Sequence, residues 1–171
     1  MVFVDGYNFI HADEELSEAL EAEGAAAARA ALAGRLARYA EAARKKITIV
    51  FDAARAQTPT PRTASRGNIR ILFSSPGESA DERILRAISR AKGGGGGGGV
   101  LVAVSDDRAL RRGAKALGAR VTGCGEFAAE IKKRLAARTR RAPEKPGRPS
   151  PGEVEYWMRV FGLKDEEGDG S

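Results

Sequence analysis

The sequence of 171 residues has little of the material from which several classes of protein are built. Its one cysteine, Cys124, excludes a disulfide framework and favours a reducing compartment. Its one histidine, His11, gives little support to a Ser-His-Asp hydrolase and argues against a zinc site. No stretch approaches the roughly 20 uncharged residues of a membrane span, and Asp5 interrupts the apolar start where a signal peptide would lie. We therefore expect a soluble cytoplasmic protein, with no membrane contact and no small-molecule organic cofactor.

Positive charge is present in excess, and it gathers in two stretches. The net charge is +6, and residues 132–148 hold eight basic residues against Glu144 alone. Residues 53–77 carry four arginines and no acid. Both stretches could simply be solvated surface, but together they favour a polyanionic partner. The candidate contacts with that partner are Arg55, Arg62, Arg66, Arg70, Lys132 and Lys133.

Apolar strands alternate with helical patterns along the chain, and this order indicates the fold class. With 42% hydrophobic residues the chain has enough apolar material for one domain with a real core. Strands that alternate with helices predict a parallel sheet with helices on both sides. A long loop containing Pro59 and Pro61 should follow the second strand. The expected strands are residues 2–4, 47–51, 69–73, 100–104 and about 120–122, and the helices that follow the third, fourth and fifth of them are 78–92, 106–117 and 126–138.

The chain divides into three parts by composition. Residues 1–141 form the α/β domain, in which the seven glycines 93–99 connect a helix to a strand at the amino end of the sheet, away from the acids. Residues 142–151 are rich in proline and basic residues and read as a linker. Residues 152–171 contain an amphipathic helix, with Trp157 and Phe161 on its apolar stripe, and an acidic tail. That helix should dock on its own domain or bind a partner.

Three aspartates occupy comparable places in separate segments. Asp5 follows the first strand with Asn8 close behind, and Asp106 follows the fourth strand. Asp81 continues the apolar stripe of the helix that starts near Glu78. Each has a simpler explanation: Asp5 as a turn residue, Asp81 beside a Ser79–Glu82 capping box, and Ser105 or Asp106 as a helix N-cap.

Taken together, these acids predict a cation site. Ends of parallel strands meet at one edge of the sheet, so Asp5, Asp81 and Asp106 should converge there. Their mutual repulsion would raise their pKa values unless a cation lay between them, and oxygen ligands suit Mg²⁺ or Mn²⁺. We predict these three as metal ligands, Asn8 as an orienting group, and Glu78 or Asp107 as a group that holds a second ion or accepts a proton.

Five short motifs in this order resemble one family, the YacP-like NYN-domain proteins, relatives of the PIN-domain nucleases. They are Val-Asp-Gly-Tyr-Asn at 4–8, Val-Phe-Asp-Ala at 50–53, Gly-Glu-Ser-Ala-Asp-Glu-Arg-Ile at 77–84, Val-Ser-Asp-Asp-Arg at 104–108 and Gly-Glu-Phe at 125–127. The resemblance covers about residues 1–138. It implies a PIN-like three-layer α/β/α fold and metal-dependent endoribonuclease activity. It also suggests the ribosome as partner, because the family includes a ribosome-associated endonuclease that cuts messenger RNA in the A site.

The resemblance also implies residue roles. Asp5, Asp81 and Asp106 match the family's acidic centre and Asn8 its amide, while Asp52, Glu78, Glu82 and Asp107 match the surrounding polar shell. The products would be a 5′-phosphate and a 3′-hydroxyl, and single-stranded RNA should reach the acids along the arginines from Arg55 to Arg70.

Two other functions stay open at this stage. One is an RNA- or ribosome-binding module of the same fold without catalysis. The other is a phosphatase with an aspartate nucleophile, which is weak because Tyr7 and Ala54 stand where a second aspartate would follow Asp5 and Asp52.

Overall fold

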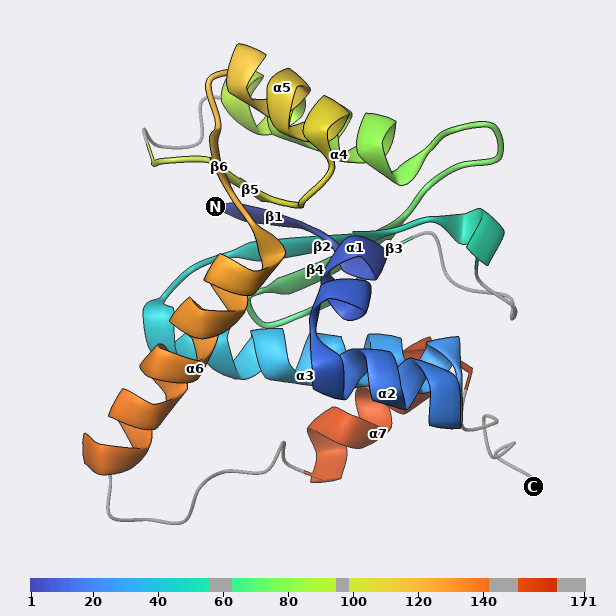
Figure 1. Ribbon diagram of the computed structural model, residues 1–171, viewed down its shortest axis with the longest axis vertical. Helices are drawn as coiled ribbons and strands as arrows, with labels where there is room; N and C mark the ends of the chain where they lie inside the picture. Colours follow the sequence, from blue (N-terminus) through green and yellow to red (C-terminus); the bar gives the residue numbers. More distant parts are fainter. Residues whose placement is uncertain (56–62, 95–98, 142–150, 163–171) are drawn as a thin grey trace, which may run out of the picture.

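A twisted sheet runs through the centre of the computed structural model, which describes residues 1–55, 63–94, 99–141 and 151–162 (Figure 1). Within these residues the sheet has six strands in the order β3-β4-β2-β1-β5-β6. All neighbours are parallel except β3, which runs antiparallel to β4. The strands are β1 (Val2–Asp5), β2 (Ile47–Phe51), β3 (Thr63–Arg66), β4 (Ile69–Phe73), β5 (Val102–Val104) and β6 (Arg120–Thr122).

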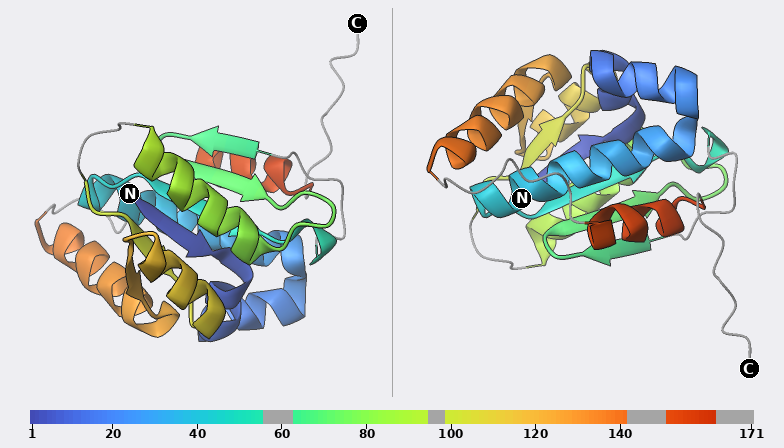
Figure 2. Two further views of the ribbon diagram at one scale, coloured as in Figure 1. Left: turned by 90° about the horizontal axis from the view of Figure 1, so that it is seen from above. Right: turned by 90° about the horizontal axis from the view of Figure 1, so that it is seen from below.

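Helices cover both faces of this sheet, which confirms the three-layer α/β/α class (Figures 1 and 2). The helices α4 (Ala80–Gly93) and α5 (Arg108–Ala116) lie on one face. On the other face lie α3 (Ala25–Ala43), α6 (Cys124–Arg141) and α7 (Pro151–Val160). Two shorter helices, α1 (Gly6–Ala12) and α2 (Glu14–Glu23), connect β1 to α3. A short 3-10 turn, Ala53–Arg55, follows β2. No helix in the described ranges combines the length and apolar character that crossing a lipid bilayer requires.

The sheet has one more strand than the five expected, because β3 falls in the stretch assigned to a loop. Its residues are largely exposed and carry no apolar alternation, so the sequence gives no strand signal there. Gly67, with φ +56°, makes the tight turn that brings β3 back along β4. The prolines Pro59 and Pro61, and glycines 95–98 of the run between α4 and β5, lie outside the described residues.

Alternating side chains along the strands build two separate cores. Val2 and Val4 of β1 face the α3 side and Phe3 faces the α4 side. The cluster on the α3 side is the larger and holds the aromatic rings, among them Tyr39 and Phe127 at 5.3 Å between centroids. The cluster on the α4 side is smaller and mainly aliphatic. The same alternation sends Asp5 and the residue after β2, Asp52, toward the α4 face.

The helix α7 docks on its own chain, one of the two outcomes expected for it. Trp157 and Phe161 are fully buried against α3 and the sheet. The buried guanidinium of Arg29 lies 5.2 Å from the Phe161 ring centroid and donates a hydrogen bond to the Tyr7 hydroxyl at 2.8 Å. The side chain of Tyr156 donates to the Ser65 carbonyl at 3.0 Å. The predicted linker, apart from Pro151 at the start of α7, and the acidic tail from residue 163 lie outside the described residues.

Candidate active site

The strand order reverses between β1 and β5, and the acids gather at that reversal. From β1 the chain builds outward through β2 and β4, then returns to place β5 on the other side of β1. In open α/β sheets the crevice beyond the carboxyl ends of two such strands is where ligands bind. Asp5 ends β1, Asp106 and Asp107 follow β5, and Asp81 lies in the first turn of α4.

Asp5 is held firmly at this edge. Its side chain accepts hydrogen bonds from the Asn8 backbone N–H at 3.2 Å and from the Ser105 hydroxyl at 3.4 Å, and the residue is only 8% exposed. The turn expected at Asp5-Gly6 is not formed, because α1 starts directly at Gly6 with Asp5 as its N-cap. A Cβ atom on Gly6 would lie 2.2 Å from the Phe51 ring, so glycine serves close packing there.

Asn8 ties α1 to the loop after β5. Its side-chain oxygen accepts hydrogen bonds from the Asp106 backbone N–H at 2.8 Å and from the Cys124 thiol at 3.2 Å. Burial, followed by the nearby Asp106 carboxylate, raises the pKa of Cys124 to about 12, so the thiol stays protonated and acts as a donor. With its oxygen engaged, Asn8 has its NH₂ group to offer to an anionic ligand in the pocket that it lines.

A cavity of about 420 Å³ opens between these segments. Asp81 is half-buried beside it, and burial raises its pKa, with the carboxylates of Asp107 and Glu82 adding to the effect. The Asp107 side chain also caps α5 by accepting from the Ala109 and Leu110 N–H groups at 2.7 and 2.8 Å. The pocket is lined by Asp5, Tyr7, Asn8, His11, Asp52, Ser79, Ala80, Asp81 and Asp107.

Asp106 stands at the same edge, but its side chain turns aside. Its carboxylate accepts from the Cys124 N–H at 3.1 Å and lies 3.9 Å from the Arg111 guanidinium. It does not line the pocket, whereas its neighbour Asp107 does. The N-cap of α5 also differs from the expected one, since Asp107 and not Ser105 or Asp106 caps that helix. The structure therefore brings Asp5, Asp81 and Asp107 together.

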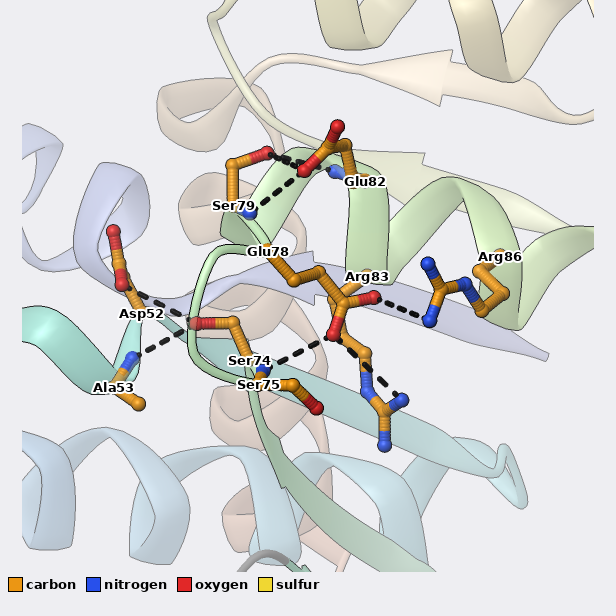
Figure 3. A network of polar contacts seen from close by, with 9 residues as sticks. All are labelled: Asp52, Ala53, Ser74, Ser75, Glu78, Ser79, Glu82, Arg83 and Arg86. Carbon is orange, nitrogen blue, oxygen red and sulfur yellow. Dashed lines mark hydrogen bonds and ion pairs between the residues drawn. The ribbon is translucent and has the colours of Figure 1, made fainter.

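Glu78 is held by arginines (Figure 3). It is not among the residues that line the pocket. It is 3.0 Å from the Arg86 guanidinium and 3.9 Å from that of Arg83, and it accepts from the Ser75 N–H at 3.0 Å. Its role here is to fix the loop before α4.

The two remaining acids of the polar shell also hold backbone in place. Glu82 forms the expected capping box with Ser79 (Figure 3). Asp52 lines the pocket while accepting from the Ser74 hydroxyl at 3.2 Å and the Ala54 N–H at 3.0 Å. Glu82 and Asp52 therefore shape the loops around the pocket.

The oxygen atoms that line the pocket suit a hard divalent ion but do not surround one. They belong to carboxylate and amide groups, which Mg²⁺ and Mn²⁺ favour. Across the described ranges, however, no group of three or more His, Cys, Asp or Glu side chains is arranged to hold a metal ion. Mg²⁺ usually binds through one or two carboxylates plus water and substrate phosphate, so Asp81 and Asp107 fit that kind of partial site.

Sequence reasoning missed Tyr7 and Ser79 as pocket residues. Tyr7 is buried, and its hydroxyl accepts from Arg29, a contact that spans 22 positions and has no local signal. Ser79 was assigned to the capping box, a role that it performs while also lining the pocket. His11, which gave little support to a hydrolase or zinc site, is exposed and also lines the pocket.

The predicted polyanion contacts fall in three places. Lys132 and Lys133 are exposed on α6. Arg66 is engaged with α7, donating to the Gly152 carbonyl at 2.7 Å and lying over the Tyr156 ring. Arg70 is exposed on β4 and lines a second cavity beside α4. The Arg55 side chain and all of Arg62 lie outside the described part of the chain.

These features define a three-layer α/β protein with an acidic pocket at the switch point of its sheet. The model of the YacP-like NYN domain matches residues 2–153, and the chain belongs to that family, whose fold is that of the PIN-like nucleases.

Solved structures of one protein share this fold. The crystal structure of Rae1 (YacP) from Bacillus subtilis is 21% identical, with a TM-score of 0.71 over 95% of this chain and 91% of that one. A tryptophan-to-leucine mutant of the same protein is 23% identical, with a TM-score of 0.66 over 95% and 96%. No curated protein matches the chain.

Proposed function

We propose that this protein is a metal-dependent endoribonuclease that cleaves single-stranded messenger RNA in association with the ribosome, in the cytoplasm. Membership of a nuclease family supports an RNA substrate. The observation that carries the catalytic part is Asp81, whose carboxyl is half-buried beside other carboxylates and has a raised pKa. Such a group costs stability unless it meets a cation, so its placement in a pocket supports a functional role.

The pocket residues divide the work by position. Asp81 and Asp107 would hold a Mg²⁺ or Mn²⁺ ion, with Asp5 in the same pocket and Asp106 on the adjoining loop as further direct or water-mediated ligands. A bound ion of this kind polarises a phosphodiester and promotes attack by water. Asn8 presents its NH₂ group to the phosphate, and the Asp5 contacts keep that amide at a constant position relative to the loop after β5.

The ribosomal part of the proposal has separate support. It rests on the resemblance to the family and on the exposed basic surface of α6, which includes Lys132 and Lys133. Polybasic surface favours ribosomal RNA without specifying sequence. A Lys132→Ala, Lys133→Ala variant should therefore sediment less with ribosomes at moderate salt than the wild type, while cleaving free RNA equally well. Equal sedimentation of the two proteins would refute ribosome association and leave the proposed cleavage unaffected.

Cleavage is tested with purified protein, Mn²⁺ or Mg²⁺, and unstructured RNA, with and without ribosomes. Wild type should cut the RNA and leave 5′-phosphate ends, whereas Asp5→Asn and Asp81→Asn should leave it intact. Glu18→Gln, which removes an exposed acid on α2, is the matched control and should cut normally. If wild type and both pocket variants leave RNA equally intact under every condition, the catalytic proposal is wrong and the binding module takes its place.

A further inference from the structure

A second cavity, of about 500 Å³, lies at the other end of the sheet from the acidic pocket. It opens between α4 and the β3–β4 hairpin, where β2 and β4 begin; Figure 2 (left) shows α4 crossing this face with α5 on one side and β3 and β4 on the other. We call it the basic groove. Its basic side chains are Lys46, Arg70, Arg83, Arg86 and Arg90.

One wall of the basic groove is a stripe along α4. Arg83, Arg86 and Arg90 are spaced by three and four residues, so they share one helix face. The same helix carries Asp81 into the acidic pocket at its first turn. At 1.5 Å per residue, Asp81 and Arg90 are roughly 13 Å apart along the axis. A single rigid helix therefore spans both cavities.

The opposite wall comes from the sheet. Arg70 alternates with Leu72, which belongs to the core on the α4 side, so Arg70 also faces α4. Its register partner on β2 is Thr48, which lines the groove as well. Lys46 immediately precedes β2 at the mouth of the groove.

The charge in the basic groove is poorly compensated. No aspartate or glutamate is among the described residues that line it. Glu78 pairs with Arg83 and Arg86, but one carboxylate neutralises one of the two. None of the ion pairs within the described ranges involves Lys46, Arg70 or Arg90. Concentrated positive charge in a concave site attracts a polyanion.

We propose that the basic groove binds the backbone of single-stranded RNA a few nucleotides away from the phosphate held in the acidic pocket. This inference rests on the proposed function, because it extends the path of the same substrate. The volume is within the range of small-ligand pockets, which suits part of one strand and not a duplex. RNA would then run along α4, and Arg70 would act here, at the end of the sheet opposite the acids.

Binding is tested by fluorescence anisotropy in EDTA, with the full chain and an unstructured labelled RNA of about 12 nucleotides. Arg70→Ala with Arg90→Ala should weaken binding roughly tenfold and reduce the slope of log K against log salt by roughly 1.4, since two phosphate contacts are lost. Arg112→Ala with Arg120→Ala removes the same charge from exposed positions on α5 and β6 and is the matched control; it should behave like wild type. Affinity and slope equal to wild type in the Arg70, Arg90 variant would overturn the proposal.

Two further measurements separate this result from others. Arg70→Lys with Arg90→Lys keeps the charges and should retain most of the affinity, which guards against a folding effect of the alanine variant; loss of binding in both would count against the groove. A duplex competitor should displace the labelled strand poorly, and efficient displacement would contradict a single-strand site. Cleavage by wild type and by Asp81→Asn is measured in parallel. If the Arg70, Arg90 variant loses binding but wild type does not cleave RNA, the groove proposal stands and the proposed function is refuted. If wild type cleaves RNA and the Arg70, Arg90 variant binds normally, the proposed function stands and the groove proposal is refuted.

Discussion

Two carboxylates on opposite faces of the sheet have pKa shifts of opposite sign. Glu130 on α6 receives a hydrogen bond from the Tyr39 hydroxyl and lies 3.2 Å from the Lys45 ammonium, and these partners lower its pKa. Asp81 on α4 is desolvated beside Asp107 and Glu82, and its pKa is raised. Glu130 is therefore surrounded by a donor and a cation, whereas Asp81 is surrounded by other acids.

The wider structure repeats this contrast. On the α3 face, Asp13 is paired with Arg35 at 2.7 Å, and the Arg29 guanidinium lies over the Phe73 and Phe161 rings. Even beside α4, Glu78 is paired with arginines and stays out of the pocket. The two faces therefore differ: charged groups on the α3 face are paired and stabilise the fold, whereas the edge of the α4 face carries the acids to which we assign the proposed chemistry.

The largest expected effect lies on the stabilising face. Phe161→Ala removes a fully buried ring that stacks on Trp157 and lies beside Arg29, so it should lower the free energy of unfolding by about 3–5 kcal/mol. Val154→Ala on α7, the helix that ends just before Phe161, removes an exposed side chain and should change the free energy of unfolding by less than about 0.5 kcal/mol. Urea unfolding measures both. Equal, small losses would mean that α7 is not part of the stabilising face.

The next largest expected effect is on the rate of RNA cleavage. Asp81→Asn should reduce the rate of RNA cleavage by roughly 10²–10³-fold, because a charged group at the reacting phosphate is lost. Glu130→Gln, the corresponding change on the other face, should leave that rate unchanged. Single-turnover cleavage of labelled RNA gives the comparison. A comparable loss of rate in both variants would show that Asp81 has no special role in cleavage compared with Glu130.

Gly6→Ala tests the close contact between the start of α1 and the Phe51 ring. The new methyl group would lie 2.2 Å from the Phe51 ring, so the ring or α1 must move, at a cost of about 1–3 kcal/mol in stability. Because α1 carries Asn8, cleavage should fall as well. Thermal melts and cleavage rates report the two losses, and a variant with wild-type stability would show that the contact is not tight. Gly125→Ala, where an added Cβ meets nothing within 4 Å, is the control.

The smallest effect concerns pH and Glu130. Its folded pKa lies below the ordinary value of 4.5, so its stabilising contribution is present above that value and disappears as the pH falls through the folded pKa. The side chain is half exposed and screened by solvent, so Glu130→Gln should cost less than about 1 kcal/mol near neutral pH. Unfolding measured from pH 7 downward should show the variant and wild type converging. A gap that widens in acid would contradict the assignment.

Much of the fold and of the acidic edge was predictable from the sequence. Strands buried on both faces, such as residues 47–51, give continuous apolar runs, and a parallel sheet then forces their carboxyl ends to one edge. This rule predicts that Asp5 and the residues after β5 lie at the same edge. The antiparallel β3 could not be predicted, because an exposed edge strand needs no apolar pattern and takes its pairing from β4.

The details that distinguish neighbouring acids lay beyond the sequence. Asp106 and Asp107 are adjacent and chemically identical, and their directions depend on which N–H groups they meet. The backbone of Asp106 is held by the side chain of Asn8, 98 residues earlier in the chain. Glu78 was predicted to hold a second ion or accept a proton, but it precedes α4, and its direction is set by Arg83 and Arg86.

The most direct test of the cation site is the melting temperature of wild type and Asp81→Asn at neutral pH, with and without Mn²⁺. A raised pKa means that the ionised Asp81 destabilises the fold above its ordinary value of 3.8, so without metal the variant should melt higher than wild type. Mn²⁺ at 100 times its Kd should stabilise wild type by about 2.7 kcal/mol and the variant by much less. A wild type that ignores Mn²⁺, or a variant that melts lower without it, would contradict the account.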